Sequence, residues 1–199
     1  MSFRRQGDKP FWENDPSFNT PEKRGQLISY VVRKQYSMIC EFVEQPVCSM
    51  AMYGEIAELY KQGHIEVPEG VIKIWADNGY GKMVSRRHGN LNHRVPALPE
   101  VEDEGKNGVY YHVTFHDLQV SNHITQFPSS AELIVDELTT AFAVGADEYL
   151  LVNSGNILPH LYTLDLAANL WTYGNTDAEQ QLTDFIGRGR NSITIRYGK

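Results

Sequence analysis

The chain has 199 residues, of which 41% are hydrophobic and 22% are charged. This composition is typical of a globular protein with one substantial core, and it argues against a disordered chain. The formal net charge of −7 argues against general nucleic-acid binding, because a phosphate backbone requires a basic surface.

Two further classes are not supported by the sequence. No apolar run reaches membrane-spanning length and no signal peptide is recognised, so we expect no membrane partner and leave the compartment open. Only two cysteines are present, Cys40 and Cys48. They provide neither a disulfide framework nor a zinc signature.

The N-terminal part predicts a strand end, a loop and a long helix. Residues 2–4 have the pattern of a strand tail that runs into the polar loop 5–19. Thr20-Pro21-Glu22 is a helix start, with an N-cap residue, proline in the first turn and an acid. Apolar residues then recur at helical spacing, which predicts a helix through about Phe42.

Two strand predictions follow, each ending in a polar loop. Val47–Met52 is apolar and ends at Tyr53-Gly54-Glu55, where a second helix begins that closes near Gly63. Val71–Ala76 is apolar and rich in β-branched residues, which predicts a buried strand. It is followed directly by the polar, glycine-containing loop Asp77–Gly81.

The longest irregular stretch is Gly79–Lys106. It contains a basic cluster and then an acidic run, Glu100–Glu104; the cluster comprises Lys82, Arg86, Arg87, His88, His93 and Arg94. A loop of this length within a compact domain is usually functional or mobile. Its local positive charge favours an anionic small ligand despite the negative net charge.

The C-terminal half continues the alternation of strands and helices. Val109–Phe115 and Tyr149–Val152 read as strands. Ser129-x-x-Glu132 predicts a capping box that opens a helix ended by Gly145. Further helices are predicted over Pro159–Trp171 and from Asp177 to Ile186.

Together, roughly five strands separated by helices or long crossings predict an α/β protein with a parallel sheet and right-handed crossovers. A parallel barrel and an open doubly wound sheet both fit this pattern. We expect residues 1–199 to form one domain. In either fold, the polar loops after the strands open on the same edge of the sheet.

Polar and ionisable residues follow four of the predicted strands, and His112 lies within a fifth segment. The strand-end residues are Arg4 and Asp8, Glu55, Asp77 and Asn78, and Asn153 and Asn156. Each one has a simple structural explanation: a turn, a first-turn acid favoured by the helix dipole, or a satisfied core histidine. As a group on one rim they resemble a site arranged for acid–base chemistry.

Metal binding is the rival interpretation. His112 and His116 share a face if their strand is regular, and His123 lies beyond them, but this spacing is not specific for zinc. No glycine-rich dinucleotide motif, P-loop or Gly-x-Ser-x-Gly elbow is present. We therefore expect no cofactor, and a metal-dependent hydrolase remains an open alternative.

Five segments in this order resemble glycoside hydrolase family 115, the xylan α-1,2-glucuronidases. They are RRQGDKPFW (Arg4–Trp12), MYGEIAELY (Met52–Tyr60), VPEGVIKIWADNGYG (Val67–Gly81), GVYYHVTF (Gly108–Phe115) and GADEYLLVNSGNILPHLYTLDLAANLW (Gly145–Trp171). The basic stretch between them suggests a divergent branch.

The resemblance implies a (β/α)8 barrel of the TIM type that belongs to a larger inverting enzyme. Such an enzyme removes glucuronic or 4-O-methylglucuronic acid side chains from xylan or a related acidic glycan. The family's Arg-Gly-x-Gly-Asp-like motif falls on Arg4–Asp8, which makes Asp8 the general acid. Its Tyr-x-Glu segment falls on Tyr53–Glu55, its Tyr-Tyr-His segment contributes His112, and the asparagine that ends a late strand is Asn153.

From these matches we assign catalysis to Asp8 as acid and to Glu55 as the leading candidate for the base. We assign substrate binding to the remaining residues, with cationic groups holding the carboxylate of the sugar: Arg4, Tyr53, Asp77, Asn78, Arg86, Arg87, His112 and Asn153. The base could also come from a strand outside this chain.

The sequence departs from the family pattern in three ways. Arg5 replaces a glycine, and Asp77-Asn78-Gly79 replaces Asp-Asp-Asn. The chain also corresponds only to about the last five strands of a barrel. We therefore expect an incomplete barrel, which associates with itself or with a missing half. A non-catalytic carbohydrate-binding or degenerate barrel fragment is the alternative from another class.

Overall fold

A computed structural model describes the backbone of residues 4–5, 9–10, 12, 15–85, 96–116, 122–123, 126–174 and 176–197. Side chains are described for 12, 15–85, 96–115, 126–174 and 176–189. Within these residues, no helix is both long enough and apolar enough to cross a membrane.

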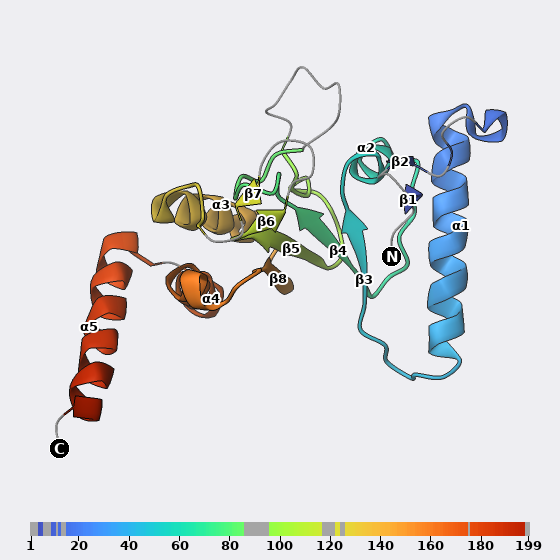
Figure 1. Cartoon of the computed structure of the whole chain (residues 1–199). Helices are drawn as coiled ribbons and strands as arrows, with labels where there is room; N and C mark the ends of the chain where they lie inside the picture. The colour runs from blue at the N-terminus through green and yellow to red at the C-terminus, as the bar shows by residue number, and fades with distance from the viewer. Residues whose placement is uncertain are drawn as a thin grey trace.

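The centre of the molecule is a four-stranded parallel sheet (Figure 1). Its strands lie in chain order: β3 (Cys48–Met52), β4 (Val71–Ala76), β5 (Asn107–His112) and β8 (Tyr149–Asn153). Helix α2 (Glu55–Lys61) connects the first pair and α3 (Ala131–Ala143) lies between the last two. Consecutive parallel strands with intervening helices confirm the α/β class and are the arrangement of a TIM-type barrel segment.

Within the described residues the parallel sheet has four strands, and residues 2–3 of the predicted N-terminal strand tail lie outside them. β1 (Arg4–Arg5) pairs antiparallel with β2 (Lys9–Pro10), with Arg4 opposite Pro10.

The predicted strand Val109–Phe115 is also interrupted. β5 ends at His112, and β6 (Phe115–His116) begins a separate antiparallel pair with β7 (Asn122–His123). The N–H groups of Val113 and Thr114 both donate to the carbonyl of Asn153, which ends the regular ladder. His112 and His116 therefore do not share the face of one regular strand.

The helices follow the predicted order. α1 (Pro21–Cys40) begins after the N-cap Thr20, whose hydroxyl accepts from Lys23 N at 3.4 Å. The remaining helical elements of the described residues are two short 3-10 turns, η1 (Pro16–Phe18) and η2 (Leu158–His160), and two helices, α4 (Leu161–Tyr173) and α5 (Ala178–Tyr197).

The start of α3 differs from the predicted capping box by one residue. Ser130 is the N-cap and its hydroxyl accepts from Leu133 N at 3.3 Å. Ser129 instead donates to the carbonyl of Tyr80 at 3.1 Å. The sequence pattern allows both serines, and the contact with the 77–85 loop decides between them.

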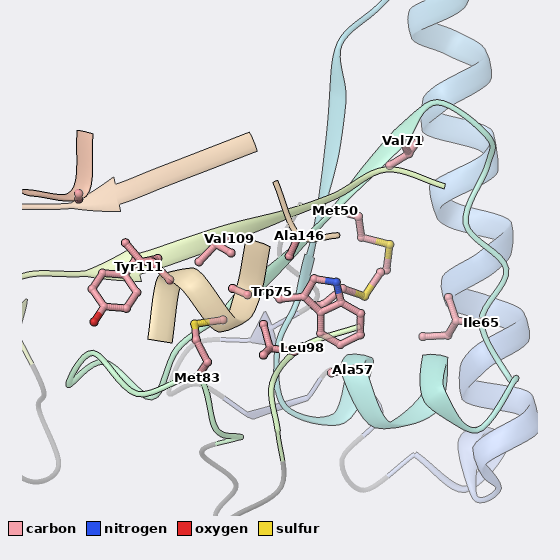
Figure 2. Close-up of a cluster of buried hydrophobic side chains, with 14 of the residues drawn as sticks. Met50, Ala57, Ile65, Val71, Trp75, Met83, Leu98, Val109, Tyr111 and Ala146 are labelled. Carbon is pink, nitrogen blue, oxygen red and sulfur yellow. The ribbon is translucent and has the colours of Figure 1, made fainter. Parts of the chain in front are cut away.

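The hydrophobic core lies on one face of the sheet. Residues that alternate along the strands, such as Met50, Trp75 and Val109, pack there with apolar residues of α1, α3 and α4 (Figure 2). Trp75 is fully buried, and its Nε1–H donates to Asn107 Oδ1 at 2.9 Å. The other set of alternating residues, which includes Tyr110 and His112, points to the opposite face.

A buried ion pair fastens the crossover between β4 and β5. The ammonium group of Lys73, in the middle of β4, contacts Asp103 and donates to Tyr60 Oη at 2.9 Å and to the carbonyl of Glu104 at 2.7 Å. All three donors of the ammonium group are used, which is what a buried charge requires.

Candidate functional site

Polar side chains meet at the carboxyl ends of the three strands β4, β5 and β8. Asp77 directly follows β4, His112 is the last residue of β5, and Asn153 is the last residue of β8. The strand register places His112 directly opposite Asn153. This is the edge at which parallel α/β sheets bind ligands.

Asp77 is a buried carboxylate with two partners. It is 2% exposed; one oxygen contacts His112 Nδ1 and the other accepts from Gly81 N at 2.8 Å. A carboxylate only accepts hydrogen bonds, so the imidazole must carry its hydrogen on Nδ1. This orientation leaves Nε2 as the ring nitrogen that a ligand can use.

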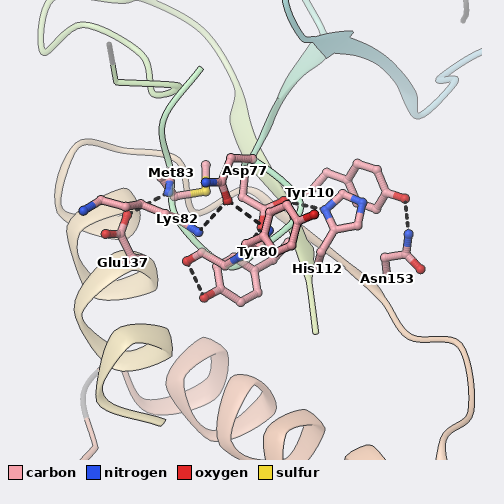
Figure 3. A network of polar contacts seen from close by, with 11 residues as sticks. Asp77, Tyr80, Lys82, Met83, Tyr110, His112, Glu137 and Asn153 are labelled. Carbon is pink, nitrogen blue, oxygen red and sulfur yellow. Dashed lines mark hydrogen bonds and ion pairs between the residues drawn. The ribbon is translucent and has the colours of Figure 1, made fainter. Parts of the chain in front are cut away.

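Tyr110 connects His112 with Asn153 (Figure 3). Its hydroxyl oxygen accepts from Asn153 Nδ2 at 2.8 Å, and its ring centre lies 4.5 Å from that of His112. Burial raises the pKa of Tyr110 above its ordinary value. The hydroxyl therefore stays protonated at neutral pH, and with its oxygen accepting from Asn153 its hydrogen can be donated to a ligand.

The loop after β4 is held by several neighbouring elements. Tyr111 Oη donates to the Gly81 carbonyl at 2.7 Å, and Glu137 of α3 accepts from Met83 N at 2.8 Å. Asn78 Oδ1 accepts from the backbone N–H groups of Tyr80 at 2.9 Å and Lys82 at 3.2 Å. The side-chain oxygen of Asn78 thus shapes the loop, as the simple turn interpretation expects.

Two aromatic rings continue the site beyond His112. Phe115 packs edge-on against His112 with ring centres 4.9 Å apart, and Tyr80 packs edge-on against Phe115 at 6.2 Å. Gly79 has a φ of +84°, and a Cβ there would lie 2.6 Å from the Phe115 ring. A residue without a side chain is therefore needed where the loop crosses this ring.

Tyr53 and Glu55 follow β3, the strand beside β4, and so lie toward the same edge of the sheet. Glu55 is the first residue of α2, after the N-cap Gly54 with φ +54°. Its position confirms the first-turn acid that the sequence predicts. A catalytic role for Glu55 stays a prediction.

Four of the residues assigned to the site are described only in part or lie outside the described residues. Asp8, Arg86 and Arg87 lie outside the described residues, and only the backbone of Arg4 is described, in β1. The separation of the assigned acid and base therefore stays a prediction, as does the cationic clamp.

No group of three or more metal-binding side chains occurs among the residues whose side chains the structure describes. His112, the first member of the predicted histidine set, contacts Asp77 through Nδ1. The side chains of His116 and His123 lie outside that description.

Sequence reasoning placed Gly81 in the polar loop after the strand Val71–Ala76, but it did not assign Tyr110 or Glu137 to the site. Tyr110 had a usable signal, because a residue two positions before His112 in a strand shares its face. Glu137 had none, since its role arises from a contact with Met83, which lies 54 positions away in the chain.

The family profile of glycosyl hydrolase family 115 matches residues 1–189. A solved structure, a family GH115 4-O-methyl-α-glucuronidase with specificity for decorated arabinogalactans, superposes with a TM-score of 0.70 at 23% identity. The match covers 94% of this chain and 24% of that structure, so the chain spans about a quarter of its length. No curated protein matches. A profile match over nearly the whole chain, together with the strand order and the carboxyl-edge site, shows that this chain belongs to glycosyl hydrolase family 115.

Proposed function

We propose that this chain provides part of the active site of an inverting glycosidase. The enzyme releases α-1,2-linked glucuronic or 4-O-methylglucuronic acid from xylan or a related acidic glycan. The observation that carries the proposal is the cluster of Asp77, His112, Tyr110 and Asn153 at the carboxyl edge of a family 115 chain. The specificity of the solved relative makes decorated arabinogalactan a second substrate to test.

In the proposed reaction Asp8 protonates the glycosidic oxygen of the leaving glycan. Glu55 takes a proton from a water molecule, whose oxygen attacks the anomeric carbon from the opposite face. The bond between that carbon and the glycan oxygen breaks, and the sugar is released as its β-anomer. Inverting enzymes hold the two carboxyl groups roughly 6.5–9.5 Å apart, which leaves room for the water.

The cluster on β5 and β8 supplies the polar contacts that orient the sugar acid. Tyr110 donates its hydroxyl hydrogen, and His112 Nε2 accepts from a sugar hydroxyl when neutral or donates to the sugar's carboxylate when protonated. Asp77 acts through His112 as a positioning residue, and Asn78 maintains the loop. Arg4, Arg86 and Arg87 provide charge for the carboxylate, and Tyr53 and Asn153 provide further polar contacts to the sugar.

The test is a proton NMR time course of the 199-residue chain with glucuronic-acid-substituted xylo-oligosaccharides. We expect the β-anomer of the released acid to appear first. Glu55→Gln should lower the rate by about 100-fold or more, because it removes the general base. Glu58→Gln, in the same helical turn, is the matched control and should leave the rate unchanged. An α-anomer as first product, or full activity in Asp8→Asn, would contradict the mechanism.

The same samples distinguish the alternatives. Calorimetric binding of the oligosaccharides without release of sugar would favour the non-catalytic module. Release that stops in the presence of a chelator and returns with added metal would favour the metal-dependent hydrolase.

A further inference from the structure

The end of β5 is joined to the loop after β8 by hydrogen bonds that lie beyond the regular strand pairing. The register of the two strands ends where His112 lies opposite Asn153. The next two residues, Val113 and Thr114, both donate their backbone N–H groups to the Asn153 carbonyl, at 3.0 and 3.3 Å. The backbone of Asn153 is therefore held by the segment that leaves β5.

Thr114 adds a contact through its side chain. It is 1% exposed, and its hydroxyl oxygen Oγ1 accepts from Gly155 N at 2.5 Å. Ser154 does not fasten the loop in the same way, because its Oγ is buried without a hydrogen-bond partner among the described residues. A glycine imposes few conformational limits of its own, so this loop depends on outside contacts for its path. The Thr114 hydroxyl provides such a contact directly after Asn153.

The same asparagine supports the hydroxyl group of Tyr110. Asn153 Nδ2 donates to Tyr110 Oη at 2.8 Å (Figure 3). An amide hydrogen on the phenolic oxygen leaves the hydroxyl's own hydrogen to point elsewhere, so the amide decides the direction in which Tyr110 donates. The asparagine side chain is short, and a shift of the Asn153 backbone therefore moves the amide by a similar amount.

We propose that Thr114 is a positioning residue of the candidate site, which fixes Asn153 and through it the direction of the Tyr110 hydroxyl hydrogen. Thr114 acts without touching a ligand, because its oxygen accepts from Gly155. Its effect passes through the loop backbone to Asn153 and then to Tyr110. The consequence for a sugar ligand rests on the proposed function, whereas the effect on Tyr110 itself does not.

Carbon NMR of the 199-residue chain, with tyrosine labelled at Cζ, tests the positioning without any substrate. Tyr110→Phe assigns the Tyr110 signal, and Asn153→Ala gives the shift of that signal when the amide donor is lost. Thr114→Val removes the hydroxyl at nearly unchanged shape, and it should move the signal in the same direction by a comparable amount. Thr114→Ser keeps an oxygen at this position and should restore the wild-type signal.

Thr139→Val is the matched control, because Thr139 Oγ1 is buried without a hydrogen-bond partner among the described residues. It should leave the Tyr110 signal unchanged. In the Asn153→Ala background, Thr114→Val should add no further shift, since the two residues act in sequence.

Three results would overturn the proposal: an unmoved Tyr110 signal in folded Thr114→Val, an equal shift in Thr139→Val, or additive shifts of Thr114→Val and Asn153→Ala. Circular dichroism verifies folding. If Thr114→Val does not fold, Thr114→Ala provides the comparison, because it leaves room for a water molecule at Gly155 N.

Turnover of glucuronic-acid-substituted xylo-oligosaccharides separates this inference from the proposed function. Thr114→Val should lower kcat/KM about three- to tenfold, the effect of one misdirected hydrogen bond. It should have no further effect in the Tyr110→Phe background. A shifted Tyr110 signal in a chain without turnover would support the positioning and contradict the proposed function. Turnover with a Tyr110 signal that Thr114→Val leaves unmoved would do the reverse.

Discussion

Asp77 is the residue on which the geometry of the candidate site depends most. Its two oxygens serve two separate segments, the imidazole of His112 on β5 and the backbone N–H of Gly81 in the following loop. Hydrogen bonds to a buried carboxylate are stronger than those between neutral groups. The same side chain therefore fixes both the imidazole and the loop.

Asp77→Asn should lower the free energy of unfolding by about 1–3 kcal/mol, because a neutral amide replaces the charged acceptor of two hydrogen bonds. Urea denaturation measures the change. Asp147→Asn is the matched control at an exposed position and should change stability by less than about 0.5 kcal/mol. Nitrogen NMR of His112 provides a second readout: a wild-type spectrum with the hydrogen on Nε2 rather than on Nδ1 would contradict the assigned tautomer.

Tyr111 is a second residue with a measurable consequence. Its side chain is fully buried and its hydroxyl donates to Gly81 O, and burial raises the pKa of Tyr111 above the ordinary value of 10.0. The folded chain therefore holds this proton more tightly than the unfolded chain. The corresponding stability is present below pH 10 and is lost as the pH rises further, because the unfolded state releases the proton first.

Tyr111→Phe should accordingly change the stability of the chain in opposite ways in two pH ranges. At pH 7 it should lower the free energy of unfolding by about 1–2 kcal/mol, since the Gly81 carbonyl loses its donor. Above pH 10 the stability of the variant should decline less steeply than that of the wild type. Chemical denaturation across pH 7–11 measures both effects. Tyr173→Phe, at a 74% exposed position, should reproduce the wild-type slope; equal slopes in all three proteins would rule out the linkage.

At the scale of elements, the loop after β4 is the part that most needs its particular residues. Gly81 has a φ of +82°, and a Cβ there would lie 2.7 Å from Phe127 Cζ and 2.8 Å from Tyr111 Oη. Conformation and crowding thus both favour glycine at this position. The loop adopts this path because β5 and the segment before α3 both lie against it.

Gly81→Ala should therefore cost about 2–4 kcal/mol, the sum of backbone strain and overpacking. Gly145→Ala isolates the first part, since Gly145 has φ +81° and a Cβ there would meet nothing within 4 Å, and it should cost about 1 kcal/mol. Thermal denaturation of both variants gives the difference. Equal losses of stability in the two variants would show that Phe127 and Tyr111 move to accommodate the new Cβ without an energetic cost.

Some elements were predictable from the chain and others were not. Val71–Ala76 forms a strand at the predicted residues. All six of its residues are buried, and all except Lys73 are apolar, which is the pattern from which the strand was predicted. The predicted capping box was wrong by one residue, because Ser129 and Ser130 can both act as N-caps and the N-cap is Ser130. Ser129 is recruited by Tyr80, a residue 49 positions away in the chain.

At the scale of the whole molecule, the Lys73–Asp103 pair connects the central strand to the long crossover. The two side chains are 4% and 6% exposed, and Tyr60 of α2 binds both of them. Burial raises the pKa of Tyr60, which keeps its hydroxyl protonated. The contact therefore holds sheet, helix and crossover in one arrangement.

Lys73→Met should lower the free energy of unfolding by about 3–5 kcal/mol, because it leaves the Asp103 carboxylate buried without its partner. Lys106→Met removes an ion pair with Glu148 whose side chains are 51% and 46% exposed, and it should cost less than about 1 kcal/mol. Adding Asp103→Leu to Lys73→Met should recover part of the loss. Denaturant titration of the four proteins checks this, and equal losses for Lys73→Met and Lys106→Met would contradict the buried character of the first pair.

The sequence by itself determined the α/β class, the order of the elements, the family resemblance and the polar residues at the strand ends. These properties depend on local hydrophobic periodicity, turn residues and short motifs, which act over a few neighbouring positions. The tertiary structure alone decided that Asp77 binds His112, that Asn153 orients Tyr110 and that Lys73 is neutralised by Asp103. Each of these contacts joins residues 30 or more positions apart. Only the register of parallel strands and the path of the crossover bring such residues together, and local sequence patterns do not encode either.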